Sequence, residues 1–482
     1  MRLIGNVEKD AQVRAVASGA LPSGDAVVVN SDGTVSVVEE TNVSQGTGTP
    51  AVFENANSTN NSVTFDSNTN KVVVTYTDQG NSNYGTAVVG TVSGTNISFG
   101  TPVVFNSSGV TLNSAVFDTA SNKVVIAYRL QTGGIGTAIV GTVSGAGISF
   151  GSSAVFENAS SLFIQATFDS NSNKVVIAYN DAANSNYGTA IVGTVSSTSI
   201  SFGSPVVFKT ARCDSIGITF DSASNKIVIT YQDWGNSYYG TAIVGTVSGT
   251  GISFGTATVF EAATTSYTSP TFDSSTGKVV IAYRDGGNSN YGTAIVGTVS
   301  GTGISFGTAV VFEAATTFYQ AATFDSNTNK VVIAYRDDGN SSYGTAIAGT
   351  VSGTSITFES PSVFETAAVE LTAVTFDSSA SKVVVAYTDG GNSNYGTAAT
   401  FTPSSTSTNL TSENFLGFAA HTYADTQSAL VNSTCTVDRN QSSLTAGQTY
   451  YVQTDGSLGT TAADPSVVAG TAISSTEIIV KG

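Results

Sequence analysis

One unit recurs at a nearly constant spacing along most of this 482-residue chain. The dipeptide Phe-Asp marks the unit and occurs seven times, at intervals of 52, 51, 52, 52, 52 and 52 residues. A period of this length is typical of repeat architectures such as solenoids and β-propellers. The phenylalanines that mark the copies are Phe65, Phe117, Phe168, Phe220, Phe272, Phe324 and Phe376.

Each copy contains four β-type runs, labelled a to d. In the fifth copy, strand a lies around Pro270–Asp273, strand b at Lys278–Tyr283, strand c at Thr293–Val299 and strand d at Ile304–Phe312. Turns rich in Asp, Asn, Gly and Ser separate the strands. Strand b is continuously apolar, as expected in a sheet buried on both faces. This pattern predicts an all-β fold, a seven-bladed β-propeller with four-stranded blades, and a β-helix is the alternative.

The two ends of the array complement each other. The seventh copy stops after strand c, near Phe401, and has no strand d. An isolated segment before the first copy, Gly48–Glu54, matches strand d of the other copies, for example Gly307–Glu313. We therefore expect this N-terminal strand to pair with strand c of the last blade and close the ring, which removes open sheet edges.

Closure of the ring would bring the two flanks of the array together. Adjacent strands lie about 4.8 Å apart, so residues 1–47 and 404–482 should form one split β carrier domain with the propeller, 48–403, inserted in it. An Asp-Gly turn at Gly33 predicts a hairpin in the first flank, and a similar run at Gly456 predicts one in the second. Strand direction places the d–a and b–c connections on the propeller face that points away from the carrier.

The chain is acidic, with 34 Asp and Glu against 17 Lys and Arg and a formal net charge of −17. Contacts to phosphates need clustered basic residues, so we exclude nucleic acid and anionic membranes as partners. No apolar run approaches the ~18 residues of a transmembrane helix. The N-terminus carries charges such as Arg2, Lys9 and Asp10 in place of an apolar core, so we expect no secretory signal peptide.

The copies agree in their a–b and c–d turns and differ in their d–a connections. Aromatic and charged side chains concentrate there, on the face predicted to point outward. Loops on a rigid scaffold often carry binding residues, so we interpret this face as a recognition surface, with neutral drift as the alternative. The single tryptophan, in a b–c loop, suits sugar stacking, although packing would also explain it. The predicted binding residues are Leu162, Phe163, Asp214, Trp234, Tyr238, Tyr267, Phe318, Tyr319 and Glu370.

The b–c loops offer oxygen ligands for a cation. The fifth copy has Asp285, Asn288 and Asn290 in this loop, and such oxygens could ligate Ca²⁺. The same residues form Asx turns that satisfy the loop backbone. The loops lack a strict Asp-x-Asp-x-Asp pattern, and the second copy replaces the loop with Leu130–Ile135. We therefore favour turn structure over Ca²⁺ and predict no metal or cofactor.

The sequence contains no convincing catalytic constellation. The only histidine, His421, lies outside the copies and has no nucleophile motif beside it, so no catalytic triad can be argued. Asp214 and Glu370 leave glycoside hydrolysis by paired carboxylates open. We predict that the chain is not an enzyme. No Asp-box motif of a propeller sialidase accompanies the arginines that follow strand b, which are Arg129, Arg284 and Arg336.

The flanks resemble a known family. Val16–Asp25 with its following hairpin, Asn409–Gly417, and the runs LTAGQTYYVQTDGSLGTT from Leu444 and VVAGTAISSTEIIVKG from Val467 resemble the terminal modules of virion structural proteins of marine tailed phages. The repeats are also similar to those of such proteins. The resemblance implies an all-β virion component without enzyme activity, a fibre, knob or capsid decoration exposed at the particle surface.

The resemblance also explains a protein without a secretory signal, because phage structural proteins assemble in the host cytoplasm and leave at lysis. We expect a non-enzymatic virion surface protein that displays its propeller to the host surface or its glycans. It would contact other virion proteins through the carrier domain, and virion symmetry favours a homo-oligomer. A bacterial cell-surface adhesin or lectin is the first alternative, and a polysaccharide hydrolase is the second.

Overall fold

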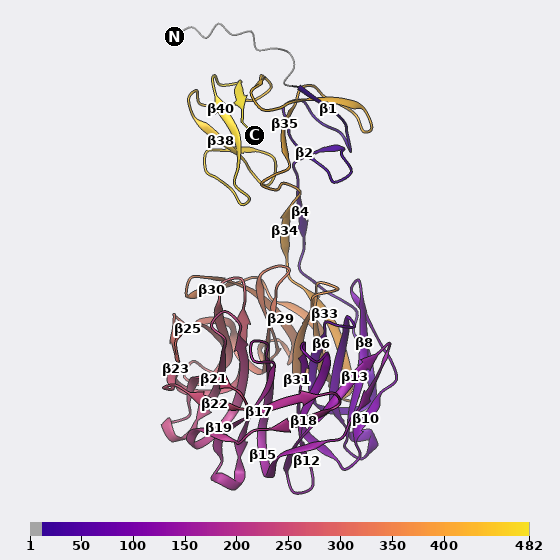
Figure 1. Cartoon of the computed structure of the whole chain (residues 1–482), viewed down its shortest axis with the longest axis vertical. Coiled ribbons are helices and arrows are strands. Elements are labelled where there is room, and N and C mark those ends of the chain that lie inside the picture. The colour runs from indigo at the N-terminus through magenta and orange to yellow at the C-terminus, as the bar shows by residue number, and fades with distance from the viewer. Residues whose placement is uncertain (1–11, 482) are drawn as a thin grey trace. The chain divides into compact units, whose positions relative to one another are not determined.

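The computed structural model describes residues 12–481 as an all-β chain (Figure 1). The chain divides into two compact regions. The repeat region is Gln45–Pro403, and the flanking region joins the segment ending at Ser44 to the segment beginning at Ser404. Residues 1–11, which carry the charges that argue against a signal peptide, lie outside the described residues. The described helices are short 3-10 turns, none long and apolar enough to cross a membrane: η2 (Gln79–Asn81), η3 (Ala182–Asn184), η4 (Trp234–Asn236) and η5 (Asp338–Asn340).

The fifth copy shows how one repeat folds. Its strand b is β24 (Lys278–Asp285), which pairs antiparallel with the second half of β23 (Thr258–Asp273) and with β25 (Tyr291–Ser300). β25 also pairs with β26 (Gly303–Phe306) and with the first residues of β27 (Val310–Asp325). The copy is therefore an antiparallel sheet with the predicted strand order a, b, c, d.

The same order of pairing recurs in the other copies. The remaining strands of the repeat region are β5 (Gly46–Thr47), β6 (Ala51–Asp66), β7 (Lys71–Asp78), β8 (Tyr84–Ser93), β9 (Asn96–Phe99), β10 (Val103–Asn106), β11 (Val110–Asp118), β12 (Lys123–Leu130), β13 (Ile135–Ser144), β14 (Gly147–Phe150), β15 (Ala154–Asp169), β16 (Lys174–Asp181), β17 (Tyr187–Ser196), β18 (Ser199–Phe202), β19 (Val206–Asp221), β20 (Lys226–Asp233), β21 (Tyr239–Ser248), β22 (Gly251–Phe254), β28 (Lys330–Asp337), β29 (Tyr343–Ser352), β30 (Ser355–Phe358), β31 (Ser362–Asp377), β32 (Lys382–Asp389) and β33 (Tyr395–Thr402).

Strand d and the d–a connection differ from the prediction. The sequence predicts one strand d at Ile304–Phe312, but the structure has two, β26 and the start of β27, with residues 307–309 between them. Between the fifth and sixth copies the d–a connection is not a loop, because β27 continues from strand d into strand a; between the first and second copies, residues 107–109 interrupt it. β27 exchanges its partner β25, last paired at Thr316, for β28, first paired at Thr317, so a strand joins the two copies.

The N-terminal strands of the repeat region complete the last sheet. β33 pairs with β6, with Gly396 opposite Glu54, and with β5, with Phe401 opposite Thr47. This is the pairing that the sequence predicts for Gly48–Glu54. The chain therefore enters and leaves the repeat region at neighbouring, paired strands.

Successive copies are related in the same way around the whole repeat region. The inner strands contact one another in the order β6, β11, β15, β19, β23, β27 and β31, and β31 in turn contacts β6. Gln232 Nε2 donates to the carbonyl of Thr265 in the next copy at 2.6 Å. Thr388 Oγ1 of the seventh copy donates to the carbonyl of Ser58 in the first copy at 2.7 Å. The first and last copies are therefore neighbours.

Apolar packing between strands explains why the repeat is so regular. Val279, Ile281 and Tyr283 of β24 are fully buried, and burying such a side chain stabilises a fold by roughly 1.5–3 kcal/mol. A glycine in strand c makes room for the phenylalanine of strand d. A Cβ atom on Gly292 would lie 2.4 Å from the ring of Phe312, so any side chain there would displace the ring.

The flanking region contains two five-stranded sheets with the orders β1-β36-β35-β2-β3 and β37-β41-β40-β38-β39. A two-stranded ribbon of β4 (Glu40–Val43) and β34 (Ser405–Thr408) accompanies them. The strands of the two sheets are β1 (Gln12–Val16), β2 (Ala26–Val29), β3 (Val35–Val37), β35 (Phe415–Ala419), β36 (Ser428–Asn432), β37 (Val437–Asp438), β38 (Thr449–Val452), β39 (Leu458–Gly459), β40 (Val467–Ala472) and β41 (Ile478–Val480).

The two sheets of the flanking region are similar modules. Both predicted hairpins are present, β2 with β3 and β38 with β39. The Thr34 N–H donates to Asp32 Oδ1 at 2.9 Å, the Ser457 N–H donates to Asp455 Oδ1 at 2.9 Å, and the glycine after each aspartate has a φ of +83°. The second module is continuous in the chain. The first is interrupted between β3 and β35, where the second has the short β39–β40 connection.

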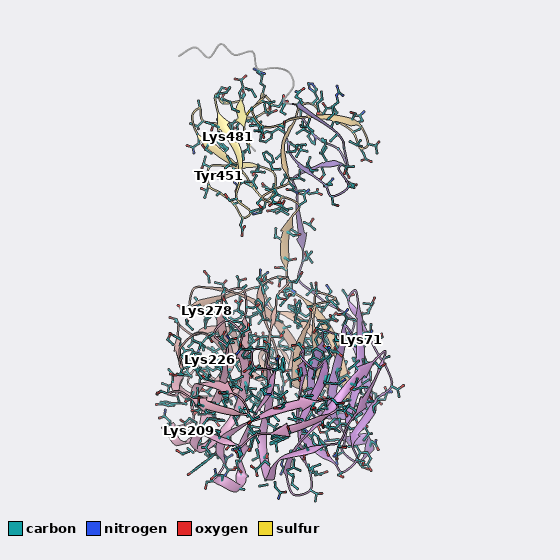
Figure 2. The ribbon with its side chains drawn as sticks, viewed as in Figure 1. Lys71, Lys209, Lys226, Lys278, Tyr451 and Lys481 are labelled. Carbon is teal, nitrogen blue, oxygen red and sulfur yellow. The ribbon has the colours of Figure 1, made fainter. Side chains whose placement is uncertain are left out.

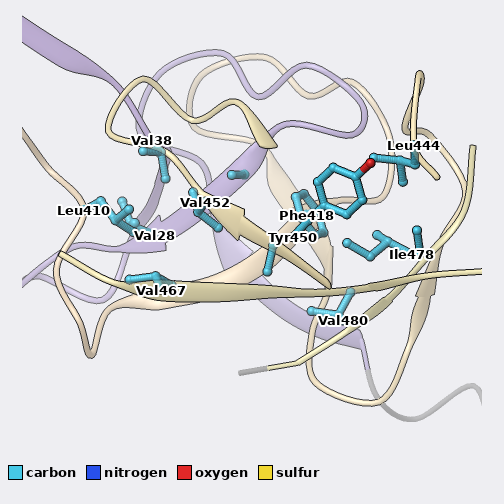
Figure 3. Close-up of a cluster of buried hydrophobic side chains, with 13 residues drawn as sticks. Val28, Val38, Leu410, Phe418, Leu444, Tyr450, Val452, Val467, Ile478 and Val480 are labelled. Carbon is cyan, nitrogen blue, oxygen red and sulfur yellow. The ribbon is translucent and has the colours of Figure 1, made fainter. Parts of the chain in front are cut away.

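One hydrophobic core joins residues from both flanks of the chain (Figure 3). Val28 and Val38 from the N-terminal flank pack with Phe418, Val452 and Ile478 from the C-terminal flank. Because neither flank holds all of these side chains, each needs the other to bury its apolar surface.

Candidate ligand-binding face

Inner-strand side chains from all seven copies line a central channel with two different ends. The turn end lies beside the Phe-Asp turns and has a cavity of about 520 Å³. The crossing end lies where the long strands pass from one copy to the next and has a cavity of about 280 Å³. At the crossing end, the seven corresponding residues are Asn60, Leu112, Phe163, Ser215, Tyr267, Tyr319 and Leu371.

These seven residues, the crossing-end ring, share an unusual backbone conformation. Each has a φ between +48° and +53°, in the left-handed region that residues other than glycine rarely adopt. They lie in β-bulges, where the pairing register shifts, as between Ser266 and Ser269 of β23. The conformation costs roughly 1–2 kcal/mol for each such residue. The surrounding structure therefore enforces a backbone that presents one side chain per copy to the channel.

Polar side chains of the following copy hold some of these bulges in place. Asn113 Nδ2 donates to the carbonyl of Asn60 at 2.6 Å, and Thr268 Oγ1 donates to the carbonyl of Ser215 at 2.6 Å. These bonds satisfy a bulge carbonyl across a copy boundary. The bulge therefore belongs to the scaffold, while the side chain that it presents differs from copy to copy.

Three aromatic side chains gather on one side of the crossing end. The ring of Tyr267 lies 5.8 Å from that of Phe318 and 5.3 Å from that of Tyr319. The guanidinium of Arg284 lies 4.7 Å from the Phe318 ring and 5.1 Å from the Tyr267 ring, and that of Arg336 lies 5.1 Å from the Phe318 ring. All five side chains, which we call the aromatic–arginine cluster, are partly exposed. Cation–π contacts of this kind hold the guanidinium groups against the rings.

The predicted residue Glu370 lies at the edge of this cluster. Arg336 Nε donates to Asp338 at 2.7 Å, and an Arg336 terminal nitrogen lies 4.0 Å from Glu370. Burial raises the pKa of Tyr319, and the negative charge of Glu370 raises it further. The structure thus brings together four of the predicted residues, Tyr267, Phe318, Tyr319 and Glu370.

A second group surrounds the only tryptophan. Trp234 packs edge-on against Tyr238, with 4.7 Å between ring centroids, and the Arg212 guanidinium lies 3.8 Å from the Trp234 ring. Two nitrogens of Arg212 donate to the carboxylate of Asp214, at 3.1 and 2.8 Å. The exposed fractions of Trp234 and Tyr238 are 38% and 40%. Asp214 departs from its prediction as a surface binding residue, because it is only 7% exposed and holds Arg212 in place.

The last two predicted residues, Leu162 and Phe163, belong to neither group. Phe163 is the third member of the crossing-end ring and packs against the core of the next copy. Leu162 is partly buried and lies opposite Asn180 in the sheet. The carboxylates considered for hydrolysis have different partners, since Asp214 binds Arg212 while Glu370 lies beside Arg336.

The position that follows the tyrosine of strand b has a role that the sequence alone does not reveal. Four copies place a short polar residue there, which donates to a carbonyl of the next copy; Asn180 Nδ2, for example, donates to Cys213 O at 2.8 Å. The other three copies have arginine there: from the first copy to the seventh, the position is Thr, Arg, Asn, Gln, Arg, Arg and Thr. The arginines that replace the polar residue are Arg129, Arg284 and Arg336.

The turn end repeats nearly the same residues in every copy. The buried Asp325 carboxylate accepts the backbone N–H of Asn327 at 2.8 Å and that of Thr328 at 3.2 Å. Basic residues here bind strand-c threonines, as Lys278 Nζ donates to Thr298 Oγ1 at 2.9 Å. These bonds fix the turns. Figure 2 labels three lysines that make this contact, Lys71, Lys226 and Lys278.

The b–c loops use their carboxylates in turns, as favoured from the sequence. Asp285 Oδ1 accepts the N–H of Gly287 at 2.8 Å and that of Asn288 at 3.1 Å. Asp337 and Asp389 also accept backbone N–H groups of their loops. Within residues 12–481, no three His, Cys, Asp or Glu side chains are grouped so that they could hold a metal ion.

Comparison with known proteins relates this chain to others by its fold. No protein-family model and no curated protein sequence matches it. The BP39L lectin from Burkholderia pseudomallei is a structural neighbour with a TM-score of 0.56 and 11% identity, covering 72% of this chain and 96% of the lectin. A structure described as the Dos1 propeller has a TM-score of 0.44 and 12% identity, covering 81% of this chain and 94% of that one. The chain is thus an all-β protein that shares its fold with the lectin.

Proposed function

We propose that the repeat region is a seven-bladed β-propeller, closed by its N-terminal strand, that binds glycans at its crossing end without a cofactor. The cyclic order of inner-strand contacts and the pairing of β33 with β6 support the proposal of seven blades. The flanking region acts as the carrier domain, because the propeller is inserted into the first of its two modules. The protein is not an enzyme in this proposal.

The aromatic–arginine cluster is the observation that carries the glycan proposal. Aromatic rings present flat apolar faces that match the C–H faces of sugars, while hydroxyl and guanidinium groups bind sugar oxygens. Tyr267, Phe318 and Tyr319 supply three such rings within one partly exposed cluster. The Trp234–Tyr238 pair supplies two more. The fold shared with a bacterial lectin adds support for a carbohydrate ligand.

We propose further that the chain is a virion surface protein of a tailed phage, a fibre, knob or capsid decoration, which contacts the host surface. The flank sequences from Val16 and from Leu444 support this setting by their resemblance to phage virion proteins. The protein would assemble in the host cytoplasm and contact other virion proteins, or further copies of itself, through the flanking region. A bacterial cell-surface adhesin or lectin is the second candidate, because the lectin neighbour comes from a bacterium.

Glycan binding is tested with the full-length protein on an array of bacterial and algal polysaccharides. We expect binding to a defined subset of glycans, which the Tyr267→Ala and Phe318→Ala substitutions weaken. Ser326→Trp is the matched control, because Ser326 lines the turn end and is exposed. An array without any binder, or equal losses in all three variants, would contradict the proposed ligand face.

The virion setting is tested separately by immunogold labelling of phage particles with antibodies against the full chain. We expect gold at the particle surface. Labelling of bacterial envelopes in the absence of particles would instead support the adhesin.

A further inference from the structure

The inference concerns the ligand class of the aromatic–arginine cluster and rests on the proposed function. Arg284 is partly exposed at the crossing end. Its Nε donates to Ser266 Oγ at 3.0 Å, and its guanidinium lies over the rings of Phe318 and Tyr267. Among residues 12–481, no carboxylate forms an ion pair with Arg284, and neither of its terminal nitrogens has a hydrogen-bond acceptor.

The other arginines of this face are differently engaged. Arg212 binds the Asp214 carboxylate with two nitrogens. Arg336 binds Asp338 and approaches Glu370. Arg129 uses both terminal nitrogens on hydroxyl groups, those of Thr111 at 3.1 Å and Ser160 at 3.4 Å. Among these four arginines, only Arg284 lies against aromatic rings and has no ion pair or hydrogen bond at either terminal nitrogen.

The fold does not require an arginine at this position. Gln232 occupies the same position one copy earlier and donates to the carbonyl of Thr265. Arg284 makes no such bond to the sixth copy and donates to Ser266 of its own copy instead. A guanidinium here thus replaces a bond between blades with a cation held flat on the surface.

We propose that Arg284, with the rings of Tyr267, Phe318 and Tyr319, binds the anionic group of an acidic sugar. The two terminal nitrogens form a planar fork that matches the paired oxygens of a carboxylate or a sulfate ester. The rings beside the fork hold the sugar to which that anion is attached. The net charge of −17 repels polyanions at long range, so binding of a polyanion requires a local site of this kind.

The test measures the affinity of the full-length protein for three immobilised polymers with the same backbone, namely dextran, carboxymethyl-dextran and dextran sulfate. We expect at least one charged polymer to bind about tenfold or more tightly than dextran, as a charge-assisted paired hydrogen bond allows. The stronger of the two charged polymers identifies the anion as carboxylate or sulfate.

The variant that tests the site is Arg284→Gln, which installs the residue that the preceding copy already uses and should fold. We expect it to abolish the preference for the charged polymer. Arg129→Gln removes the same charge at the corresponding position of the second copy and should retain the preference. Thermal unfolding of both variants confirms that they are folded.

Three outcomes would overturn the inference. These are binding to neither charged polymer, equal binding to charged and neutral polymers, and equal losses in Arg284→Gln and Arg129→Gln. Binding of neutral glycans on the array combined with any of these results would leave the proposed function standing. An array without any binder would remove the proposed function itself.

Discussion

The two ends of the channel differ in what their repeats hold constant. At the turn end, the backbone is constant and the side chains are nearly so, as each Phe-Asp aspartate is buried and caps its own turn. At the crossing end only the backbone is constant. The crossing-end ring has the same left-handed φ in all seven copies, although its side chains include Asn, Leu, Phe, Ser and Tyr. A fixed bulge that presents a variable side chain is a suitable frame for binding, because the side chain can change without altering the fold.

The largest expected difference between the two ends is in the stability lost when an aspartate is replaced by alanine. Asp325→Ala removes a buried carboxylate that accepts the N–H groups of Asn327 and Thr328, so it should lower the free energy of unfolding by about 1–3 kcal/mol. Asp338→Ala removes an exposed carboxylate near the crossing end and should change it by about 0.5 kcal/mol or less. Urea unfolding measures both values. Equal destabilisation by the two substitutions would contradict the assignment of Asp325 to the scaffold and of Asp338 to the surface.

A second prediction concerns the residues two positions after the crossing-end ring, which line the channel between its two ends. Ser269 Oγ accepts the Ala322 N–H of the next copy at 2.9 Å, whereas the corresponding glycine, Gly217, faces Pro270, which has no N–H. A Cβ atom on Gly217 would lie 2.4 Å from Pro270 Cδ. Gly217→Ser should therefore lower the free energy of unfolding by about 1–3 kcal/mol through overpacking.

The matched control for these residues is Ala321→Ser, which places a hydroxyl opposite the N–H of Val374. It should leave the thermal midpoint unchanged or raise it. A neutral Gly217→Ser would show that copies are not packed as tightly at their boundaries as the structure indicates.

A smaller effect is expected from protonation of the strand-d glutamates. Tyr283 Oη donates to Glu261 Oε2 at 3.0 Å, and burial raises the pKa of Glu261, with the charge of Asp285 adding to the shift. Because this pKa is higher in the folded state, its contribution to stability is present below the ordinary value of 4.5 and is lost as pH rises through the raised pKa. Glu261→Gln should therefore be at least as stable as the wild type at neutral pH, with no advantage in acid.

The pKa of Asp455, in the flanking region, is shifted in the opposite direction. Hydrogen bonds from Ser457 lower the pKa of Asp455, so its contribution is present above the ordinary value of 3.8 and is lost as pH falls through the lowered pKa. Asp455→Asn should lower the thermal midpoint at neutral pH and have no effect in strong acid.

A Glu261→Gln variant that is less stable than the wild type at neutral pH would contradict the assigned burial of Glu261.

The smallest predicted effect concerns the crossing-end ring itself. Leu112→Asn should leave the free energy of unfolding unchanged or raise it by up to about 1 kcal/mol, because Asn tolerates the left-handed region and the first copy already has Asn60 there. Leu112→Val should lower it, because a β-branched residue is strained at positive φ. Chemical denaturation distinguishes the two variants, and the reverse order would show that the bulge is not enforced by the fold.

The features that could be predicted from the sequence are those that the copies share. The Phe-Asp period, the apolar strand b and the match of Gly48–Glu54 to strand d predict the sheet order and the pairing of β33 with β6. The hairpins at Gly33 and Gly456 are equally local, since their turns need only Asp-Gly and its neighbours.

The crossing end was less predictable because its determinants are not local. No glycine marks the bulge at Tyr267 or Leu112, so the left-handed backbone has no signature in the sequence. The continuous strand β27 looks like a loop because its residues differ from those of other copies. The contact between Arg284 and Phe318 joins residues of neighbouring copies. Spacing does not identify Arg212 as the partner of Asp214, so the sequence predicts an exposed carboxylate where the structure has a buried one.

The most direct test of the central claim is hydrogen–deuterium exchange of the full-length protein with and without its tightest-binding array glycan. The account predicts slower exchange in peptides that contain Tyr267 and Tyr319 at the crossing end. It predicts no change in peptides that contain the Phe-Asp turns, such as Asp325–Asn329 at the turn end. Protection of the turn-end peptides, with none at the crossing end, would contradict it.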